Sequence, residues 1–242
     1  MIMDRTWQSR TEMLLGGKTL SLLSRSTVVV AGVGGVGGYA AEMLCRAGVG
    51  RLVLVDADAV AETDINRQIT ALHSTVGRSK CSVLAGRLKD INPEAEIVTV
   101  EKYMDADDVA GIIGGLGADF LVDAIDTLSP KLALIKYCVD TSLPFVSSMG
   151  SGAKTDATAV RISDISKSHN CPLAYVIRKK LRKMGIYRGF KVVYSEELPD
   201  RGAVVECEGR NKKSMVGTVS YIPAVFGCAC AQAAIEFFRD FD

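Results

Sequence analysis

The chain carries a glycine-rich turn whose glycines follow the spacing G-x-G-x-x-G at Gly32, Gly34 and Gly37. The turn comes directly after a β-branched run and directly before a segment of helical pattern. Such glycines allow a tight turn, and the amides and positive dipole end of the following helix face anionic phosphates. The sequence therefore predicts a nucleotide-binding turn that includes Gly35, and this spacing alone suits NAD, FAD and ATP.

Charged residues further along the chain favour one of these nucleotides. Asp56 stands roughly twenty residues past the glycines, where a carboxylate accepts hydrogen bonds from the ribose of either NAD or ATP. Arg67 lies in the polar loop that follows, and Lys80 begins the next helical pattern. A triphosphate needs such cations and a divalent ion, whereas the glycine turn alone usually satisfies a dinucleotide pyrophosphate. We therefore expect ATP, with three further polar residues in its site: Asp58, Asn66 and Gln68.

Two carboxylates, Asp123 and Asp126, follow the fourth strand-like run in the sequence LVDAIDT. Mg²⁺ in proteins keeps most of its waters and takes one or two carboxylates plus phosphate oxygens. We expect Asp126 to face the ligand and hold Mg²⁺, and Asp123 to cap the following turn.

The elements that position these residues alternate between β-branched runs and helical patterns. The expected strands are Thr27–Ala31, Arg51–Val55, Glu96–Val100, 120–124 and 144–147. The expected helices are 36–47, 79–91, 106–111 and 130–141. This alternation predicts a Rossmann-like, doubly wound α/β fold with a mostly parallel sheet, in which ligands lie beyond the carboxyl ends of the strands.

The alternation stops after Gly150. Residues 151–165 and 190–197 predict strands of a second, mixed layer, and no Pro/Gly/Ser-rich linker precedes them. We therefore expect an ATP-binding region over residues 1–150 that is continuous with a mixed-strand, substrate-side extension over residues 151–242.

Composition limits the partners and the compartment. The net charge is only +1, so nucleic acid or membrane must be met by a local patch. Seven scattered cysteines without a C-x-x-C pair indicate reduced thiols and disfavour a four-thiolate zinc site. With a polar amino terminus, they favour a cytoplasmic enzyme.

Residues 215–235 carry no charge and are long enough to cross a bilayer. Pro223, Gln232 and the small side chains of this segment instead favour a strand over 217–222 and a buried closing helix over 224–238. We therefore do not expect a membrane span.

The ordered motifs GVGGVGG, VDAD, NRQ, VGRSK and DAIDT resemble the ubiquitin-activating-enzyme-like superfamily, the ThiF and MoeB type of adenylating enzymes. The resemblance implies that Asp56 binds ribose, that Arg67 and Lys80 hold the phosphates, and that Asp126 is needed for adenylation. Arg10, in WQSRTEMLLG, matches an arginine that family members lend across a homodimer to the partner's ATP. The resemblance therefore implies a homodimer.

One position departs from this family pattern. Asp64 stands where the family often has Asn, two residues before the asparagine of the NRQ motif. We expect its carboxylate to repel ATP unless it is metal-bound or turned outward.

The second half resembles the tRNA threonylcarbamoyladenosine dehydratase family through SSMGSGAKTDATAVRISDISKS, CPLAYVIRKKLRKMGI and KVVYSEE. Members of that family use ATP to close the threonylcarbamoyl side chain, next to the anticodon in tRNA, into a ring. The resemblance implies adenylation of the substrate carboxylate followed by intramolecular attack. A helical core spacing over 173–181 leaves five cations for tRNA: Arg178, Lys179, Lys180, Arg182 and Lys183.

Cys171 precedes Pro172, so its thiol is expected at a helix amino terminus, a position that lowers a thiol's pKa. Two interpretations stay open. The thiol is either a transient acyl or sulfur carrier, with His169 as its base and a sulfur-transfer protein as partner, or an inert capping cysteine beside a surface histidine.

Three other functions compete with the dehydratase. An adenylating enzyme for a ubiquitin-like sulfur carrier fits the first half, although such relatives commonly hold zinc with two C-x-x-C pairs. An NAD-dependent oxidoreductase fits the glycine turn and Asp56. A non-catalytic binding partner is disfavoured because Arg10, Arg67, Lys80 and Asp126 occur together.

Overall fold

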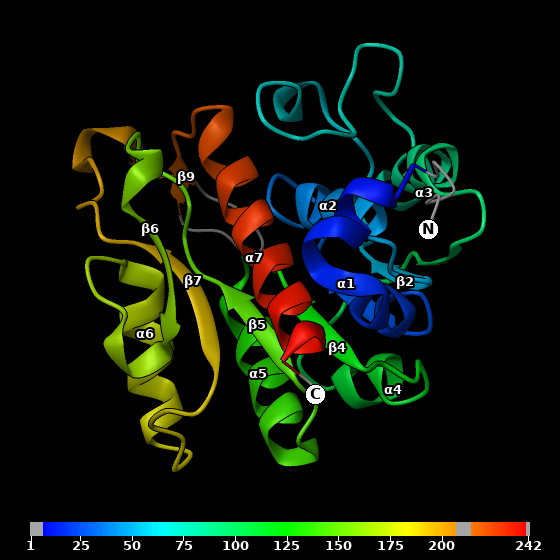
Figure 1. The fold of residues 1–242 in the computed structure, drawn as a ribbon. Helices are drawn as coiled ribbons and strands as arrows, with labels where there is room; N and C mark the ends of the chain where they lie inside the picture. Colours follow the sequence, from blue (N-terminus) through cyan, green and yellow to red (C-terminus); the bar gives the residue numbers. More distant parts are fainter. Residues whose placement is uncertain (1–6, 207–213, 241–242) are drawn as a thin grey trace.

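A computed structural model describes residues 7–206 and 214–240. Seven strands form one sheet in the order β3-β2-β1-β4-β5-β7-β6 (Figure 1). Their bounds are β1 Thr27–Ala31, β2 Arg51–Val55, β3 Glu96–Val100, β4 Phe120–Asp123, β5 Phe145–Ser148, β6 Val160–Asp164 and β7 Lys191–Ser195. Every neighbouring pair is parallel except β6 with β7. The α/β fold class is therefore confirmed.

The order in which strands are added to the sheet reverses between β1 and β4. β2 and β3 are added on one side of β1, and β4 and β5 are added on the other side. Doubly wound sheets bind ligands at such a switch point, beyond the carboxyl ends of the strands. The glycine turn after β1 and the Asp126 loop after β4 therefore meet at this point.

Helices cover both faces of the sheet. Their bounds are α1 Ser9–Leu23, α2 Gly37–Ala47, α3 Lys80–Ile91, α4 Val109–Ile113, α5 Leu128–Thr141, α6 Pro172–Arg182 and α7 Tyr221–Arg239. Side chains of α1, α2, α3 and α7 share one buried cluster with Val28 and Val30 of β1. Val29 and Ala31 point into a second cluster with α4 and α5. This alternation along β1 is the two-residue period of a strand buried on both faces.

The strands after residue 150 are present, but they lie in a different part of the fold from the one predicted. β6 and β7 do not form a second layer, because β7 pairs in parallel with β5 and continues the main sheet. A separate antiparallel pair, β8 Val204–Glu206 and β9 Ser214–Val216, follows.

The predicted strand over 217–222 is wrong. The backbone amide of Gly217 donates to Ala203 and its carbonyl accepts from Ala153, so this residue connects loops instead of extending a ladder. α7 then begins at Tyr221, and Pro223 lies in its first turn, where a missing amide hydrogen is tolerated.

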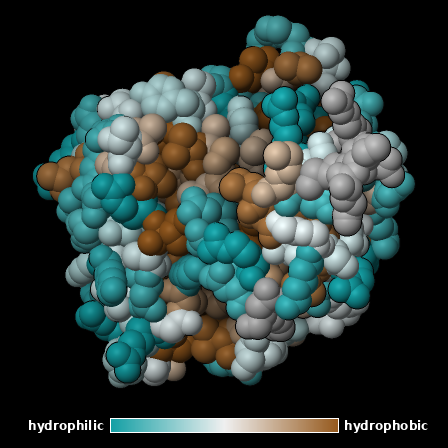
Figure 2. Space-filling view, viewed as in Figure 1, coloured by the Kyte–Doolittle hydropathy of each residue, from teal (hydrophilic) through white to brown (hydrophobic). Residues whose placement is uncertain are grey.

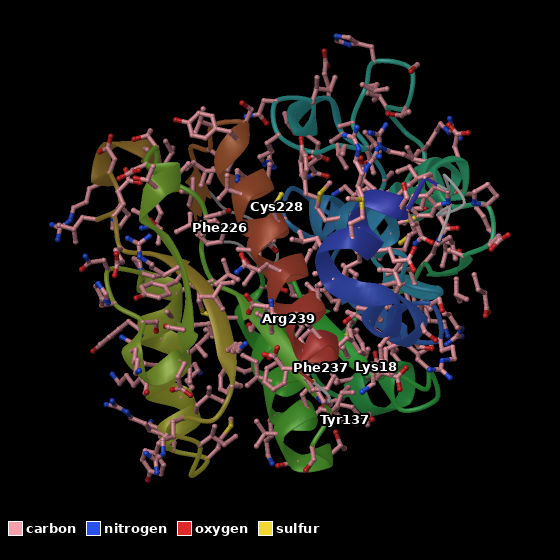
Figure 3. The ribbon with its side chains drawn as sticks, in the orientation of Figure 1. Lys18, Tyr137, Phe226, Cys228, Phe237 and Arg239 are labelled. Carbon is pink, nitrogen blue, oxygen red and sulfur yellow. The ribbon has the colours of Figure 1, made fainter. Side chains whose placement is uncertain are left out.

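α7 is long and apolar enough to cross a membrane by length and composition alone. Its middle is nevertheless packed inside the protein, since Phe226, Cys230 and Ala234 are fully buried. Figure 3 labels Phe226 and Cys228 on this helix, of which Cys228 is exposed. This packing is typical of the core helix of a globular protein, as the sequence predicts. The six cysteines among the described residues are all free, and Cys207 lies outside those residues.

Candidate nucleotide-binding site

The glycine turn connects β1 to α2 and lies against the end of β4. Gly32 has a φ of +84°, and a Cβ on it would lie 2.9 Å from the carbonyl oxygen of Ala124. A Cβ on Gly37 would lie 1.7 Å from the carbonyl oxygen of Gly32. Glycine is therefore required at both positions for this backbone path. The path brings the first turn of α2 to the carboxyl edge of the sheet, where its dipole suits an anion.

Asp56 follows β2 and holds the glycine turn from the side. Its Oδ2 accepts a 2.8 Å hydrogen bond from the backbone amide of Val33, and its Oδ1 accepts one of 2.8 Å from the amide of Asp58. Burial raises the pKa of Asp56, although these two hydrogen bonds oppose the shift. A carboxylate has about four acceptor positions, so capacity is left for ribose hydroxyls.

Lys80 is the first residue of α3, whose N-cap Ser79 accepts from the amide of Ser82. The lysine is only 6% exposed, and its Nζ lies 3.0 Å from Asp58 Oδ2 and 3.6 Å from Asp64 Oδ2. Burial by itself would lower the pKa of Lys80, but the hydrogen bond and charge of Asp58, with the charges of Asp56 and Asp64, raise it above its ordinary value. Lys80 is therefore a permanently charged group at the edge of the predicted phosphate site.

The carboxylate of Asp64 is not turned outward, and protein groups surround it. Asp64 ends the 3₁₀ turn Glu62–Asp64, is buried, and accepts hydrogen bonds from Gln68 Nε2 at 2.7 Å and from Arg67 Nη2 at 3.3 Å. With Lys80, these groups compensate its negative charge inside the protein. The spacing of three and four residues from Asp64 to Arg67 and Gln68 places the side chains on one face of a helical turn, which could have indicated this contact.

The NRQ loop is held mainly by the protein itself. Asn66 Nδ2 donates to the carbonyl oxygen of Thr218 at 3.0 Å, and Arg67 Nη1 donates to Asn66 Oδ1 at 2.8 Å. The buried Gln68 lies under Gly34, where a Cβ on the glycine would be 3.6 Å from Nε2. Gln68 Oε1 has no hydrogen-bond partner among the described residues. This unpartnered buried acceptor beside the glycine turn fits a site that is completed by a ligand.

Asp123 caps the turn after β4, as predicted, by accepting from the amide of Ile125 at 3.1 Å. It also pairs with Lys131 Nζ at 2.8 Å, and neither side chain is exposed to solvent. Lys131 donates further to the carbonyl oxygen of Ile125 at 2.9 Å. Sequence reasoning missed this lysine, although a lysine within the apolar run LSPKLALI is an indication of a buried ion pair. The pair fixes the loop that presents the exposed Asp126.

The described residues contain no group of three or more His, Cys, Asp or Glu side chains that could hold a metal ion on their own. Mg²⁺ does not require one, since one carboxylate with phosphate oxygens and water is an ordinary Mg²⁺ arrangement. The exposed carboxylate of Asp126 after β4 therefore fits Mg²⁺ bound together with a nucleotide.

Arg10 is not brought to the glycine turn of its own chain. It is exposed on α1, two residues from Gln8, whose side chain lies against Gly48 just beyond the end of α2. The glycine turn is at the opposite end of α2. Since α2 has eleven residues and rises 1.5 Å for each, its two ends are about 16 Å apart.

Cys171 does lie at the start of α6, but it is only 4% exposed and packs against Gly150. His169 is exposed, and its Nδ1 lies 3.1 Å from the carbonyl oxygen of Lys167 and 3.4 Å from the hydroxyl of Tyr194. These contacts direct the imidazole to residues other than the thiol. His169 is therefore not placed as a base for the thiol, and the Cys171 side chain makes no capping hydrogen bond to α6.

The basic helix is confirmed as α6, with Ala174, Ile177 and Leu181 buried. Four of its predicted cations are exposed: Lys179, Lys180, Arg182 and Lys183. Arg178 is half-buried, and its guanidinium donates to Ser168 Oγ.

Comparisons with known proteins agree with this geometry. The tRNA threonylcarbamoyladenosine dehydratase of Bacillus subtilis is 46% identical over 191 residues, which cover 79% of this chain and 75% of the relative. The fold superposes on the crystal structure of Escherichia coli TcdA, a tRNA N6-threonylcarbamoyladenosine dehydratase, in complex with ATP. That likeness has a TM-score of 0.87 and 33% sequence identity, over 98% of this chain and 97% of the other. The same enzyme has also been solved with AMP, and that structure gives a TM-score of 0.85 over the same coverage.

The model of the ThiF family matches residues 8–242, which include every described element of the fold and all the site residues discussed above. With these relatives beside it, the protein belongs to the ThiF family.

Proposed function

We propose that this protein is an ATP-dependent dehydratase that adenylates the carboxylate of threonylcarbamoyladenosine in tRNA and drives its cyclisation. The observation that carries the proposal is the ion-pair cluster beside the glycine turn, in which the exposed Asp58 and the buried Asp64 both pair with Lys80, and Asp64 also pairs with Arg67. This pair of fixed cations suits the phosphates of ATP. The relatives named for this reaction, one of them crystallised with ATP and AMP, supply the substrate.

The chemistry divides into two displacements. One oxygen of the substrate carboxylate attacks the α-phosphorus of ATP, and pyrophosphate leaves. A nucleophile already on the substrate then attacks the activated carbonyl carbon, and AMP leaves with one carboxylate oxygen, so the nucleoside loses one water in total. The first step gives the carbonyl a good leaving group, and the second is favoured by proximity.

The protein's own groups act mainly on developing charge. Lys80 and Arg67 stabilise the negative charge that builds on the α-phosphate and the departing pyrophosphate, while Asp56 orients the ribose. Mg²⁺, held by Asp126, would supply further neutralisation of the phosphates. In this assignment residues 1–150 hold ATP, and residues 151–242 form the substrate side of the same body.

The reaction is tested by measuring AMP and pyrophosphate with three candidate acceptors. Transfer RNA that carries threonylcarbamoyladenosine is expected to stimulate release of both products, and unmodified tRNA is not. Release stimulated only by a ubiquitin-like carrier protein would replace the dehydratase with the sulfur-carrier activity. Formation of ADP and phosphate with modified tRNA would exclude an adenylate.

The tRNA is proposed to lie with its anticodon region along α6, whose exposed cations give this nearly neutral chain a local basic surface. A cytoplasmic location is supported by the free cysteines, which a reducing compartment preserves.

A homodimer completed by Arg10 is the second part of the proposal. α1 exposes Met13 and, to 84%, Leu14, and these adjacent apolar side chains are available to an interface. Hydrophobic residues also gather near the middle of the face on which α1 and α7 lie (Figure 2). A shallow apolar groove between β6 and α7, lined in part by Ile162 and Val225, lies on that face. A second copy of the chain would cover these surfaces.

Subunit complementation tests whether Arg10 acts across the dimer. We expect Arg10→Ala and Lys80→Met to be inactive as separate homodimers. A heterodimer purified through two different tags is expected to regain about half of the wild-type activity, because one of its two sites then has both cations. An inactive heterodimer would contradict action across the interface, and failure to form any dimer would contradict the assembly itself.

Asp64→Asn tests the role of the buried carboxylate. The amide can still accept hydrogen bonds, but it loses the charge that holds Arg67 and Lys80, and charge-assisted hydrogen bonds are roughly twice as strong as neutral ones. We expect ATP affinity to fall about tenfold, which corresponds to about 1.4 kcal/mol. Calorimetric titration measures it, with the exposed Glu62→Gln in the same turn as the control. Tighter ATP binding by Asp64→Asn would mean that repulsion dominates.

A further inference from the structure

A groove runs beside the candidate site on the face covered by α5 and α6. It has a volume of about 730 Å³ and is bounded by the segment after β3, the first half of α5 and the end of α6. Its lining includes Thr127 and Leu128, which directly follow Asp126. The groove is therefore continuous with the loop that carries the proposed Mg²⁺ ligand. None of its residues belongs to the cluster assigned to ATP.

One wall of the groove is basic. Lys180 and Lys183 both line it from the end of α6, three residues apart, so their side chains are neighbours. Neither has an ion-pair partner in the part of the chain that the structure describes. Lys136 of α5 also lines the groove, but it pairs with Asp140 at 2.5 Å. Two unpaired ammonium groups on one wall suit the phosphates of a nucleic acid.

The opposite wall has a different chemistry. It comes from the segment after β3 and presents Tyr103, an aromatic side chain that is 46% exposed, together with Asp105 and Asp107. Exposed aromatic rings stack on unpaired bases, and carboxylates accept hydrogen bonds from base amino groups while they repel phosphate. The two walls therefore favour one orientation of a bound nucleotide, in which the phosphate faces α6 and the base faces Tyr103.

A single-stranded RNA segment fits this asymmetry better than a duplex does, because only unpaired bases can turn toward an aromatic side chain while their phosphates face the other way. We propose that this groove binds the single-stranded RNA that flanks the modified nucleoside, with phosphate on Lys180 and Lys183 and a base stacked on Tyr103. This inference rests on the proposed function, since it names where that substrate extends beyond the reacting nucleoside.

The test compares variants of the two walls with a matched control on the same helix. Lys180→Ala/Lys183→Ala removes the two groove cations, and Lys179→Ala/Arg182→Ala makes the same change of charge at exposed residues that do not line the groove. Binding of an anticodon stem-loop RNA is measured against salt concentration. The slope for single strands is about 0.7 for each neutralised phosphate, so the groove pair is expected to lower it by about 1.4 and the control pair by much less.

The aromatic wall is tested in the same assay. Tyr103→Ala is expected to weaken RNA binding by about 5-fold to 150-fold, the range for loss of one stacked base, and Tyr103→Phe is expected to retain it. All groove variants are expected to raise the KM for modified tRNA while the affinity for ATP stays unchanged. That split separates RNA contacts from damage to the nucleotide site.

Four outcomes would overturn the inference. Equal losses from the groove pair and the control pair would mean that α6 acts only as a diffuse basic surface. Equal binding by Tyr103→Ala and wild type would exclude stacking. Wild-type protein that fails to convert modified tRNA would overturn the proposed function and this inference with it, whereas normal conversion and an unchanged KM in the groove variants would overturn the inference alone.

Discussion

Replacing Lys80 with methionine is expected to slow adenylation by about a hundredfold to a thousandfold, the usual effect of removing one fixed group that stabilises charge in a transition state. The side chain is buried and is held by Asp58 and Asp64, so its ammonium group is fixed before ATP arrives. Methionine keeps much of the volume but removes the charge. The measurement is the initial rate of pyrophosphate release with saturating modified tRNA.

Lys89→Met provides the matched control, because Lys89 lies on the same helix but is exposed. It is expected to leave the rate unchanged. Thermal melting of both variants shows whether any loss comes from unfolding. A Lys80→Met rate within tenfold of wild type, with a normal melting curve, would show that this lysine does not stabilise the phosphates during the reaction.

Replacing Lys131 with methionine is expected to lower the free energy of unfolding by about 3–5 kcal/mol, the range for breaking a buried ion pair on one side. Asp123 and Lys131 are both fully buried with 2.8 Å between Oδ2 and Nζ. Without the lysine, the carboxylate stays in the interior, and its remaining hydrogen-bond donors among the described residues are Ser147 and the amide of Ile125. Urea unfolding at neutral pH measures the change.

The double variant Asp123→Leu/Lys131→Met is the companion experiment. Removing both charges is expected to recover most of the lost free energy of unfolding, because replacing a complete buried pair with apolar groups is often neutral. A loss below about 1 kcal/mol in Lys131→Met would contradict the buried ion pair as a stabilising element. A double variant less stable than the single one would point to packing of the lysine stem instead of charge.

The first half of the fold could be predicted from the sequence because its strands and its glycine turn are determined by residues that are close together in the chain. β1, β2 and β3 match the expected bounds to the residue, since runs rich in β-branched residues carry a strong strand pattern even in the partly exposed edge strand β3. The glycine turn was equally predictable, because two of its positions admit no side chain. Asp123 could be assigned to the turn because its spacing suits a local cap.

The second half depends on contacts between distant residues, which a pattern does not contain. Nothing in the sequence of β7 says that it pairs with β5, so its strand was predicted but its place in the main sheet was not. Pro223 marks a boundary in the sequence, but a proline suits both the end of a strand and the first turn of a helix.

The candidate site shows the same division. Motifs placed Arg67 and Lys80 in the correct loop and at the correct helix start, but they carry no information about which neighbours compensate a charge. From the motif alone, Asp64 is expected to repel ATP, whereas the structure surrounds it with Arg67, Gln68 and Lys80. The burial of Lys131 does not follow from its helical pattern, because a lysine in such a pattern normally indicates a solvent-exposed face.

The most direct test of the proposed reaction is mass spectrometry of nucleosides from threonylcarbamoyl-modified tRNA incubated with this protein and Mg-ATP. The expected result is a modified nucleoside lighter by the mass of one water, formed only when ATP is present and lost with Arg67→Ala. An unchanged nucleoside from wild-type protein that still binds ATP, or a loss of water without ATP, would contradict the ATP-dependent dehydratase.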